Sequence, residues 1–234
     1  MSYILGYITA DGCICVSKNR KHPFSLNITS KDKAHLYNIR AILGSGHRIG
    51  KKKNGRGDIA FQLQIRNPVL TEDLMNKGIL PRKTYHLDPI VVPDRYFRDF
   101  IRGFFDGDGT VYQYAVNKVP QIKAKLLSTS LSFIEDINER ICRNLGIPLK
   151  TIHHIADRNS DKRMTKHEIS FYINDCDAFA KFIYANNPTL YLPRKRKIFE
   201  RWASMSRRHY IKQNYPSKIG WHLSGGISPK IFIS

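Results

Sequence analysis

The sequence predicts an α+β protein made of two similar halves. A segment near the N-terminus, Ile4–Gly12 with the sequence ILGYITADG, recurs as Ile101–Gly109, IRGFFDGDG, 97 positions later. Each copy is followed by stretches of alternating polar and apolar residues, by segments with helical spacing and by the tetrapeptide Leu-Pro-Arg-Lys, at 80–83 and 192–195. Two copies of these features in the same order indicate pseudo-two-fold symmetry.

The alternating stretches predict β-strands with one apolar and one polar face. In the first half we expect strands around residues 24–29 and 59–66, and in the second half around 121–125 and 169–174. Apolar residues also recur at helical spacing, in residues 36–43 and 134–145. Each half therefore has helices that can cover the apolar face of its sheet and leave the polar face open.

Helix starts and a linker divide the chain. Asn67-Pro68 and Pro93-Asp94 have the residue types that begin helices, and Gly109 is suited to ending the second motif helix. Residues 198–205 predict a last helix, and residues 89–93 read as a linker. We expect an N-terminal half at 1–92, a C-terminal half at 93–210 and a basic extension at 211–234, which is either an extra contact surface or an unstructured tail.

The charge of the chain points to a polyanionic partner. It has 39 Lys and Arg residues against 19 Asp and Glu, a formal net charge of +20 spread along the sequence. Nucleic acid is favoured over an anionic membrane, because membrane binding usually needs a strongly amphipathic basic helix or a lipidation signal. No apolar run approaches the roughly 20 residues that cross a bilayer, and no signal-peptide pattern is present.

The cysteines indicate where such a protein works. The four cysteines are scattered, without the spacing of a zinc site. We expect a reducing, intracellular location, either the cytoplasm or an organelle.

Small residues allow the two repeated segments to pack as helices in close contact. Gly6 and Ala10 lie four positions apart, as do Gly103 and Gly107, so each helix has a face of small residues. This pairing is expected at the centre of the molecule.

The same pairing would bring two acids together. Asp11 and Asp108 each precede the terminal glycine of a motif, at a helix C-terminus where the helix dipole disfavours negative charge. Two such carboxylates need cations, and hard oxygen ligands suit Mg²⁺. A divalent ion there would activate water and stabilise the leaving oxygen of a phosphodiester.

The polar strand faces carry Gln, Asn, Ser, Lys and Arg at every second position. Such a face is often simply solvated, but in a chain of this charge we favour reading of base edges in the major groove, where Arg and Lys suit guanine and Asn and Gln suit adenine. The residues expected to contact DNA are Ser17, Asn19, Lys21, Ser25, Asn27, Thr29, Arg48, Lys51, Gln62, Gln64, Arg66, Tyr112, Gln121, Lys123, Lys125, His153, Ser170 and Tyr172.

The segments GYITADG at 6–12 and GFFDGDG at 103–109 resemble the paired motifs of the single-chain LAGLIDADG homing endonucleases, and the resemblance spans about residues 3–205. It implies two αββαββα halves packed through the motif helices, each with a four-stranded, saddle-shaped antiparallel sheet in the DNA major groove. It also implies a monomer, without an obligate protein partner, that hydrolyses one phosphodiester in each strand of a long asymmetric site.

The resemblance extends to the metal site. It implies that the ligands are the carboxylates of Asp11 and Asp108 and the carbonyls of Ala10 and Gly107. The implied ion is Mg²⁺, with Mn²⁺ as a substitute and Ca²⁺ bound without efficient cleavage. One motif position departs from the family pattern, because Thr9 stands where an acid is common, whereas Asp106 keeps the acid.

Basic and hydroxyl residues are expected beside the metals. Lys83 and Lys195 recur in both copies, so they are our candidates for polarising water or phosphate; the alternative is a plain phosphate contact or a solvated lysine. Ser30 and Ser130, at comparable strand ends, are candidates for ordering solvent.

Two other functions stay open for this fold. One is an intron RNA maturase, which binds RNA without cutting it, and the other is a non-catalytic DNA-binding regulator. The presence of both acids favours the enzyme.

Overall fold

Each half of the chain has the expected element order, αββαββα. The computed structural model describes residues 1–17, 23–53, 57–83, 87–156 and 165–214. The first half consists of α1 (Ser2–Asp11), β1 (Gly12–Val16), β2 (Phe24–Ser30), α2 (Lys33–Ile42), β3 (Ile49–Lys53), β4 (Ile59–Ile65) and α3 (Pro68–Asn76). The second consists of α4 (Asp94–Asp108), β5 (Thr110–Val116), β6 (Val119–Ser128), α5 (Leu131–Leu145), β7 (His153–Ala156), β8 (Thr165–Phe171) and α6 (Ile173–Ile183), followed by α7 (Pro193–Asn214). The α+β prediction is confirmed.

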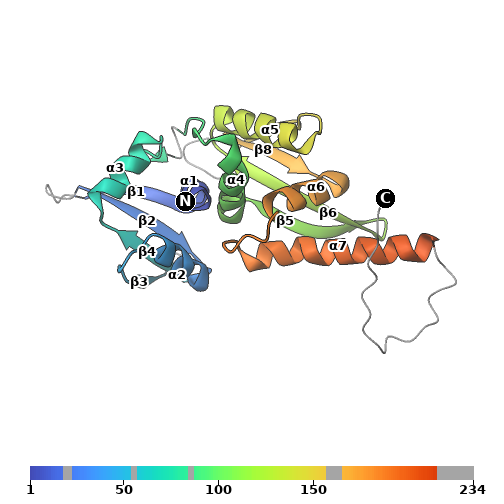
Figure 1. Cartoon of the computed structure of the whole chain (residues 1–234), viewed down its shortest axis with the longest axis horizontal. Coiled ribbons are helices and arrows are strands. Elements are labelled where there is room, and N and C mark those ends of the chain that lie inside the picture. The colour runs from blue at the N-terminus through green and yellow to red at the C-terminus, as the bar shows by residue number, and fades with distance from the viewer. Residues whose placement is uncertain (18–22, 54–56, 84–86, 157–164, 215–234) are drawn as a thin grey trace.

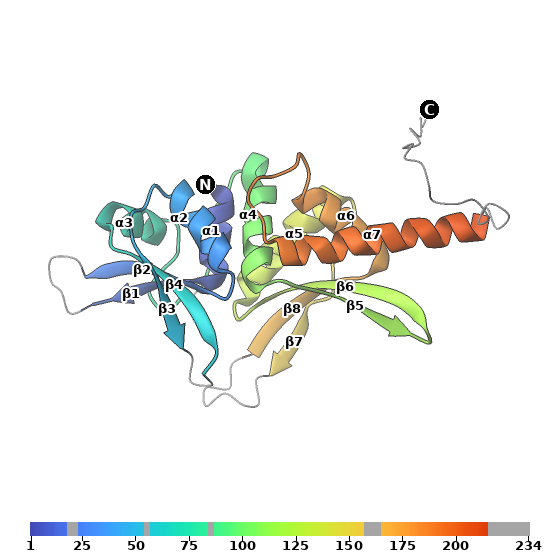
Figure 2. The same ribbon diagram turned by 90° about the horizontal axis from the view of Figure 1, so that it is seen from below.

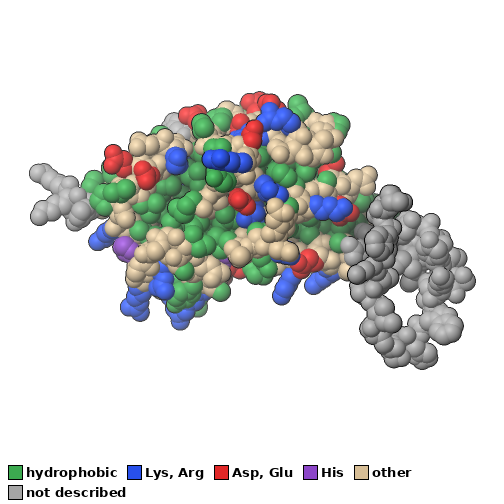
Figure 3. All heavy atoms as spheres, viewed as in Figure 1, with side chains coloured by type: hydrophobic (Ala, Val, Ile, Leu, Met, Phe, Trp, Pro, Cys, Tyr) green, Lys and Arg blue, Asp and Glu red, His purple; other side chains and the backbone are tan. Residues whose placement is uncertain are grey.

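Two four-stranded antiparallel sheets lie side by side, with strand orders β1-β2-β4-β3 and β5-β6-β8-β7 (Figure 1). The helices cover one side of both sheets, and the sheets together form an arch whose concave side is open (Figure 2). The helix-covered side mixes acidic, basic and apolar side chains (Figure 3).

The apolar strand positions form the core between sheets and helices. Leu26 and Leu63 in the first sheet, and Ile122 and Ile169 in the second, are fully buried. Because side chains alternate along a strand, the polar residues between them face the open side. The alternation in the sequence therefore predicted the orientation of the central strands.

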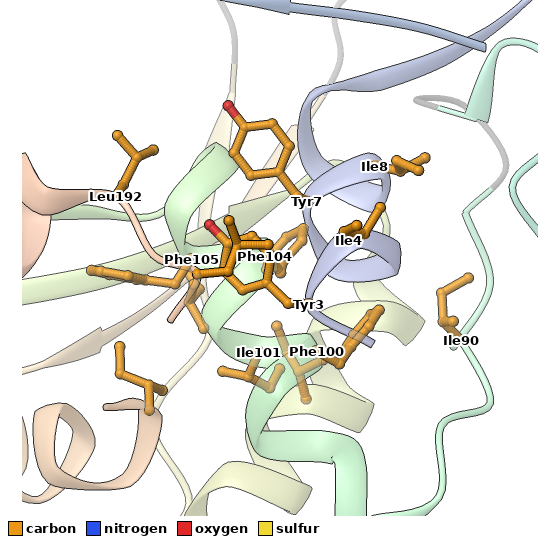
Figure 4. Packing of buried hydrophobic residues seen from close by; sticks show 14 of the residues in the cluster. Tyr3, Ile4, Tyr7, Ile8, Ile90, Phe100, Ile101, Phe104, Phe105 and Leu192 are labelled. Carbon is orange, nitrogen blue, oxygen red and sulfur yellow. The ribbon is translucent and has the colours of Figure 1, made fainter. Parts of the chain in front are cut away.

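The two halves meet along α1 and α4 (Figure 4). A Cβ atom at Gly6 would lie 1.9 Å from the carbonyl oxygen of Phe100, and one at Gly103 would lie 1.9 Å from that of Tyr3. Both distances are far below van der Waals contact, so only glycine permits this approach. The expected close pairing is present.

The terminal glycines of the motifs are required for space rather than for a left-handed backbone. Gly12 and Gly109 have φ values of −82° and −69°, in the extended region. A Cβ at Gly12 would lie 2.6 Å from Ile8 O, and one at Gly109 would lie 2.5 Å from Phe105 O. Each motif helix therefore passes directly into the strand region of its own sheet.

A buried polar network joins the halves beside this helix pair. Asp106 Oδ2 accepts hydrogen bonds from the Tyr3 hydroxyl at 2.7 Å and from Leu192 N–H at 2.8 Å. Tyr3 also lies 2.9 Å from His35 Nε2. The side chain of Thr9, at the position corresponding to Asp106, donates to Leu5 O of its own helix. At this motif position, therefore, the side chain of Asp106 links the two halves, whereas that of Thr9 stays within α1.

Two boundaries differ from the sequence prediction. The strand that was expected to reach residue 174 ends at Phe171, because Tyr172 is the N-cap of helix α6 and its carbonyl accepts from Cys176 N–H. Helix α7 runs from Pro193 to Asn214 and is therefore longer than the helix predicted from residues 198–205. Residues 215–234 of the extension lie outside the described residues.

In the part of the chain that is described, no helix is long and apolar enough to cross a membrane.

Candidate active site and nucleic-acid interface

Asp11 and Asp108 are the last residues of α1 and α4, at the ends of the helices that lead into the two sheets. The helices touch at these ends: a Cβ at Gly107 would lie 2.3 Å from Ala10 Cβ and 3.5 Å from Asp11 N. The two acids are therefore neighbours, and Asp108 is close enough to raise the pKa of Asp11. Helices α1 and α4 lie between the two sheets (Figure 2).

The electrostatics of the pair favour a bound cation. Desolvation, followed by repulsion from Asp108, raises the pKa of Asp11 to about 6, although Tyr7, Lys195 and Lys83 oppose the shift. Desolvation also raises the pKa of Asp108 against the attraction of the same two lysines. Two carboxylates that resist ionisation together gain most from a divalent ion that neutralises both.

Lys83 and Lys195 are buried beside the acids, and their ammonium groups cap the motif helices. Lys83 Nζ donates to Thr9 O at 2.6 Å and to Ala10 O at 2.9 Å. Lys195 Nζ lies 2.6, 2.8, 3.3 and 2.5 Å from the carbonyl oxygens of residues 105, 106, 107 and 109. An ammonium has three donors. The carbonyls take all those of Lys195, whereas the hydrogen bonds of Lys83 to described residues use two of its three N–H groups.

Neither lysine is a solvated side chain. Burial lowers the pKa of Lys195 to about 8 and also lowers the pKa of Lys83. The neighbouring acids oppose both shifts without cancelling them. Lys83 and Lys195 are only 8% and 5% exposed and donate to buried carbonyls, so neither is a freely solvated lysine.

The oxygen-rich surroundings fit a hard divalent cation. Among the described residues, no group of three or more His, Cys, Asp and Glu side chains could hold a metal ion. Ligands besides the two carboxylates must then be carbonyl, water or phosphate oxygens, which Mg²⁺ accepts. The carbonyls of Ala10 and Gly107 also receive lysine hydrogen bonds, and a carbonyl oxygen has a second lone pair. A hollow of about 140 Å³ adjoins Asp108 and Lys83.

The two serines expected near the metals differ in position. Ser30 Oγ lies 3.2 Å from the hydroxyl of Tyr7, a residue that opposes the rise in the pKa of Asp11. Ser130 instead caps α5 by accepting from Phe133 N–H. The strand register places Ser128, which lines the hollow, at the position that corresponds to Ser30.

Most of the residues expected to contact DNA lie on the open faces. The register and the alternation of buried positions place there Asn27, Thr29, Gln62 and Gln64 of the first sheet and Tyr112, Gln121, Lys123, Lys125 and His153 of the second. Ser17, Arg48, Arg66 and Tyr172 are exposed at strand ends. Asn19 and Lys21 lie outside the described residues.

Three of the expected contacts need correction. Ser25 and Ser170 are on the open faces but buried, at 3% and 4% exposure, because Ser25 accepts from Gln64 Nε2 and Ser170 donates to Glu168. These serines support other polar side chains. Lys51 pairs with Phe61 and so lies on the helix side of the sheet, whereas its neighbour Lys52 lies on the open face.

Comparison with known proteins agrees with this geometry. Residues 96–184 match the family model of the LAGLIDADG-like domain. The chain has the LAGLIDADG homing endonuclease fold. A sequence comparison with curated proteins gave no match.

Solved LAGLIDADG structures superimpose over almost the whole chain. The LAGLIDADG homing endonuclease I-GzeII in complex with its DNA target has a TM-score of 0.60 and 10% sequence identity, with 92% of each chain covered. Meganuclease I-SmaMI bound to uncleaveable DNA has a TM-score of 0.58 and 15% identity, covering 92% of this chain and 91% of its own. I-DmoI in complex with DNA and Ca has a TM-score of 0.53 and 16% identity, covering 88% and 96%.

The sequence analysis missed several residues on the open faces of the two sheets. Cys13 and Cys15 on β1, Tyr114 on β5 and Glu168 on β8 also lie on these faces. The alternation within each strand was a usable signal for all four. Glu168 lies directly before the predicted strand at 169–174, and its alternation with Ile169 indicates the open face.

Proposed function

We propose that this chain is a site-specific endonuclease that binds a long asymmetric site in double-stranded DNA as a monomer and hydrolyses one phosphodiester in each strand. The observation that carries the proposal is the pair of acids, Asp11 and Asp108, between two pseudo-symmetric open sheets. Two similar halves in one chain suit two unlike half-sites, and a central acid pair can serve both strands.

In this proposal Asp11 and Asp108, with the carbonyls of Ala10 and Gly107, hold divalent ions, Mg²⁺ or its substitute Mn²⁺. When bound, such an ion supplies an activated water and charge stabilisation at the phosphate. Ca²⁺ would occupy the oxygen ligands and support little cleavage. Lys83 lines the hollow at Asp108, and its hydrogen bonds to described residues use two of its three N–H groups, so this lysine is the better candidate for polarising water or phosphate. Lys195, with all its donors taken, would act by holding α4 and the carbonyl of Gly107.

The test begins with selection of a cleaved or bound sequence from a randomised duplex library. Asp11→Asn and Asp108→Asn should each reduce cleavage of both strands by orders of magnitude, while specific binding measured in Ca²⁺ falls much less. Asp73→Asn is the matched control, because Asp73 is an exposed acid on α3 and its replacement makes the same change of charge. We expect this control to cleave at the wild-type rate.

Two results would contradict the enzyme. One is cleavage at the wild-type rate by both site variants. The other is a wild-type protein that binds its selected duplex but leaves it intact in Mg²⁺ and Mn²⁺, which would support a DNA-binding regulator. Tighter binding to a structured intron RNA than to any duplex would support a maturase.

A further inference from the structure

A single acid lies among the basic residues of the open sheet faces. Of the strand residues on these faces that the structure describes, only Glu168 is acidic. Its carboxylate accepts from Lys125 Nζ at 2.9 Å and from Ser170 Oγ at 3.0 Å, and lies 3.4 Å from Lys123 Nζ. Lys123 also lies over the ring of Tyr172, 5.2 Å from its centroid. Both ammonium groups are thus held by one side chain.

The carboxylate lies beneath the lysines. Glu168 is 6% exposed, whereas the side chains of Lys123 and Lys125 keep 18% and 31% exposure. An approaching duplex therefore meets the two ammonium groups and not the acid. Although burial opposes it, hydrogen bonding by Lys125 and Ser170 lowers the pKa of Glu168, so the acid is ionised at neutral pH.

The first sheet has no such charged cluster at the corresponding positions. The pairs Leu26↔Ile65 and Ala124↔Phe171 correspond in the two sheets. Counting from them, Ser25, Asn27, Gln62 and Gln64 stand where the second sheet has Lys123, Lys125, Glu168 and Ser170. The two halves thus present different hydrogen-bonding groups to a duplex: neutral amides in one and paired ammonium groups in the other.

An unrestrained lysine is a poor reader of sequence. Its flexible stem lets the ammonium move between phosphates and base acceptors. A carboxylate that takes one donor of each ammonium fixes where the remaining donors point, and it offsets the general attraction to phosphate. Two fixed donors suit the O6 and N7 acceptors of guanine in the major groove.

We propose that Glu168 is a specificity-determining positioning residue, which directs Lys123 and Lys125 at guanines in the half-site under the second sheet. The inference rests on the proposed function, because it requires a duplex bound to the open faces. Glu168 does not touch the base itself. Its removal should therefore change discrimination more than affinity.

The test is Glu168→Gln, which keeps the shape of the side chain and installs the residue type found at the corresponding Gln62. Binding is measured in Ca²⁺ against the selected duplex and against variants with each base pair replaced in turn. We expect the preference for guanine at one or two pairs of the second half-site to fall from roughly tenfold or more to about threefold or less. Binding to unrelated duplex should rise, and the slope of log K against log salt should become more negative by up to about 0.9.

Matched variants separate this role from simple support of the fold. Gln62→Ala should relax discrimination only in the other half-site. Ser170→Ala keeps both lysine contacts of Glu168 and should have a smaller effect than Glu168→Gln.

The outcomes distinguish this inference from the proposed function. An equal loss of affinity for all duplexes by Glu168→Gln, without a gain in unrelated binding, would show a merely structural role and overturn the inference. Unchanged discrimination would also overturn it while leaving DNA binding intact. If the wild-type protein prefers no duplex over random sequence, the proposed function fails and this inference with it.

Discussion

Replacement of Gly6 by alanine tests whether close contact of α1 and α4 determines stability. The added Cβ would lie 1.9 Å from Phe100 O and 2.9 Å from Phe104 N, both backbone atoms of the partner helix. No rotamer change can relieve such an overlap, so the helices must separate by more than an ångström. Overpacking that side chains absorb costs about 1–3 kcal/mol. We expect a cost of about 3 kcal/mol or more for Gly6→Ala, partly offset by the roughly 1 kcal/mol helix preference of alanine.

Thermal unfolding in a buffer without divalent ions measures this effect. For a chain of this length, 1 kcal/mol shifts Tm by about 2–4 °C, so a net loss of about 2–3 kcal/mol corresponds to a decrease of roughly 4–12 °C. Gly46→Ala is the matched control, because a Cβ at Gly46 meets no atom within 4 Å. We expect the control to change Tm little. A Gly6→Ala protein that unfolds at the same temperature as this control would refute the packing argument.

Three further predictions concern the lysine caps, the acid pair and the open face. Lys195→Met should lower Tm more than Lys83→Met, because it removes contacts to four carbonyls rather than two; equal losses would contradict this. Folding raises the pKa of Asp11 to about 6, so the ionised carboxylate lowers the stability of the wild-type protein at pH 8. Without divalent ions, Asp11→Asn should therefore be more stable than the wild type at pH 8. This difference in stability should shrink as the pH falls from about 6 to about 4. Mg²⁺ should then raise Tm of the wild type but not of Asp11→Asn, and a margin independent of pH would contradict the assignment. Gln64→Ala should reduce the preference for the correct base at one or two positions by about 1–3 kcal/mol. Lys52→Ala should weaken binding to all duplexes alike. If Gln64→Ala also weakened binding to all duplexes alike, Gln64 would not contact the bases.

Local patterns were enough to predict the halves and the centre of the molecule. The repeat, the alternation along the strands and the small residues at Gly6 and Gly103 each act over a few positions. They predicted two similar sheets with open faces, a tight helix pair and the meeting of Asp11 with Asp108. A boundary was missed where the local signal was ambiguous: Ile173 continues the alternation of β8 but begins α6.

The partners of long side chains could not be predicted in this way. Lys83 and Lys195 were expected beside the acids, but their donors are directed to carbonyls at the ends of the motif helices, 73–74 and 86–90 residues away in sequence. Likewise, the strand register shows that Ser128, and not Ser130, is the residue of the second half that corresponds to Ser30.

The sequence by itself determined which residues face the core, which face the open side and which acids end the motif helices, because these depend on the period of a strand or helix. Only the tertiary structure decided that Asp106 joins Tyr3 to Leu192, that the lysines cap the helices and that Glu168 holds two lysines of the open face. These contacts join segments that are far apart in the chain. Their geometry is set by inter-strand register and helix packing, which no local pattern encodes.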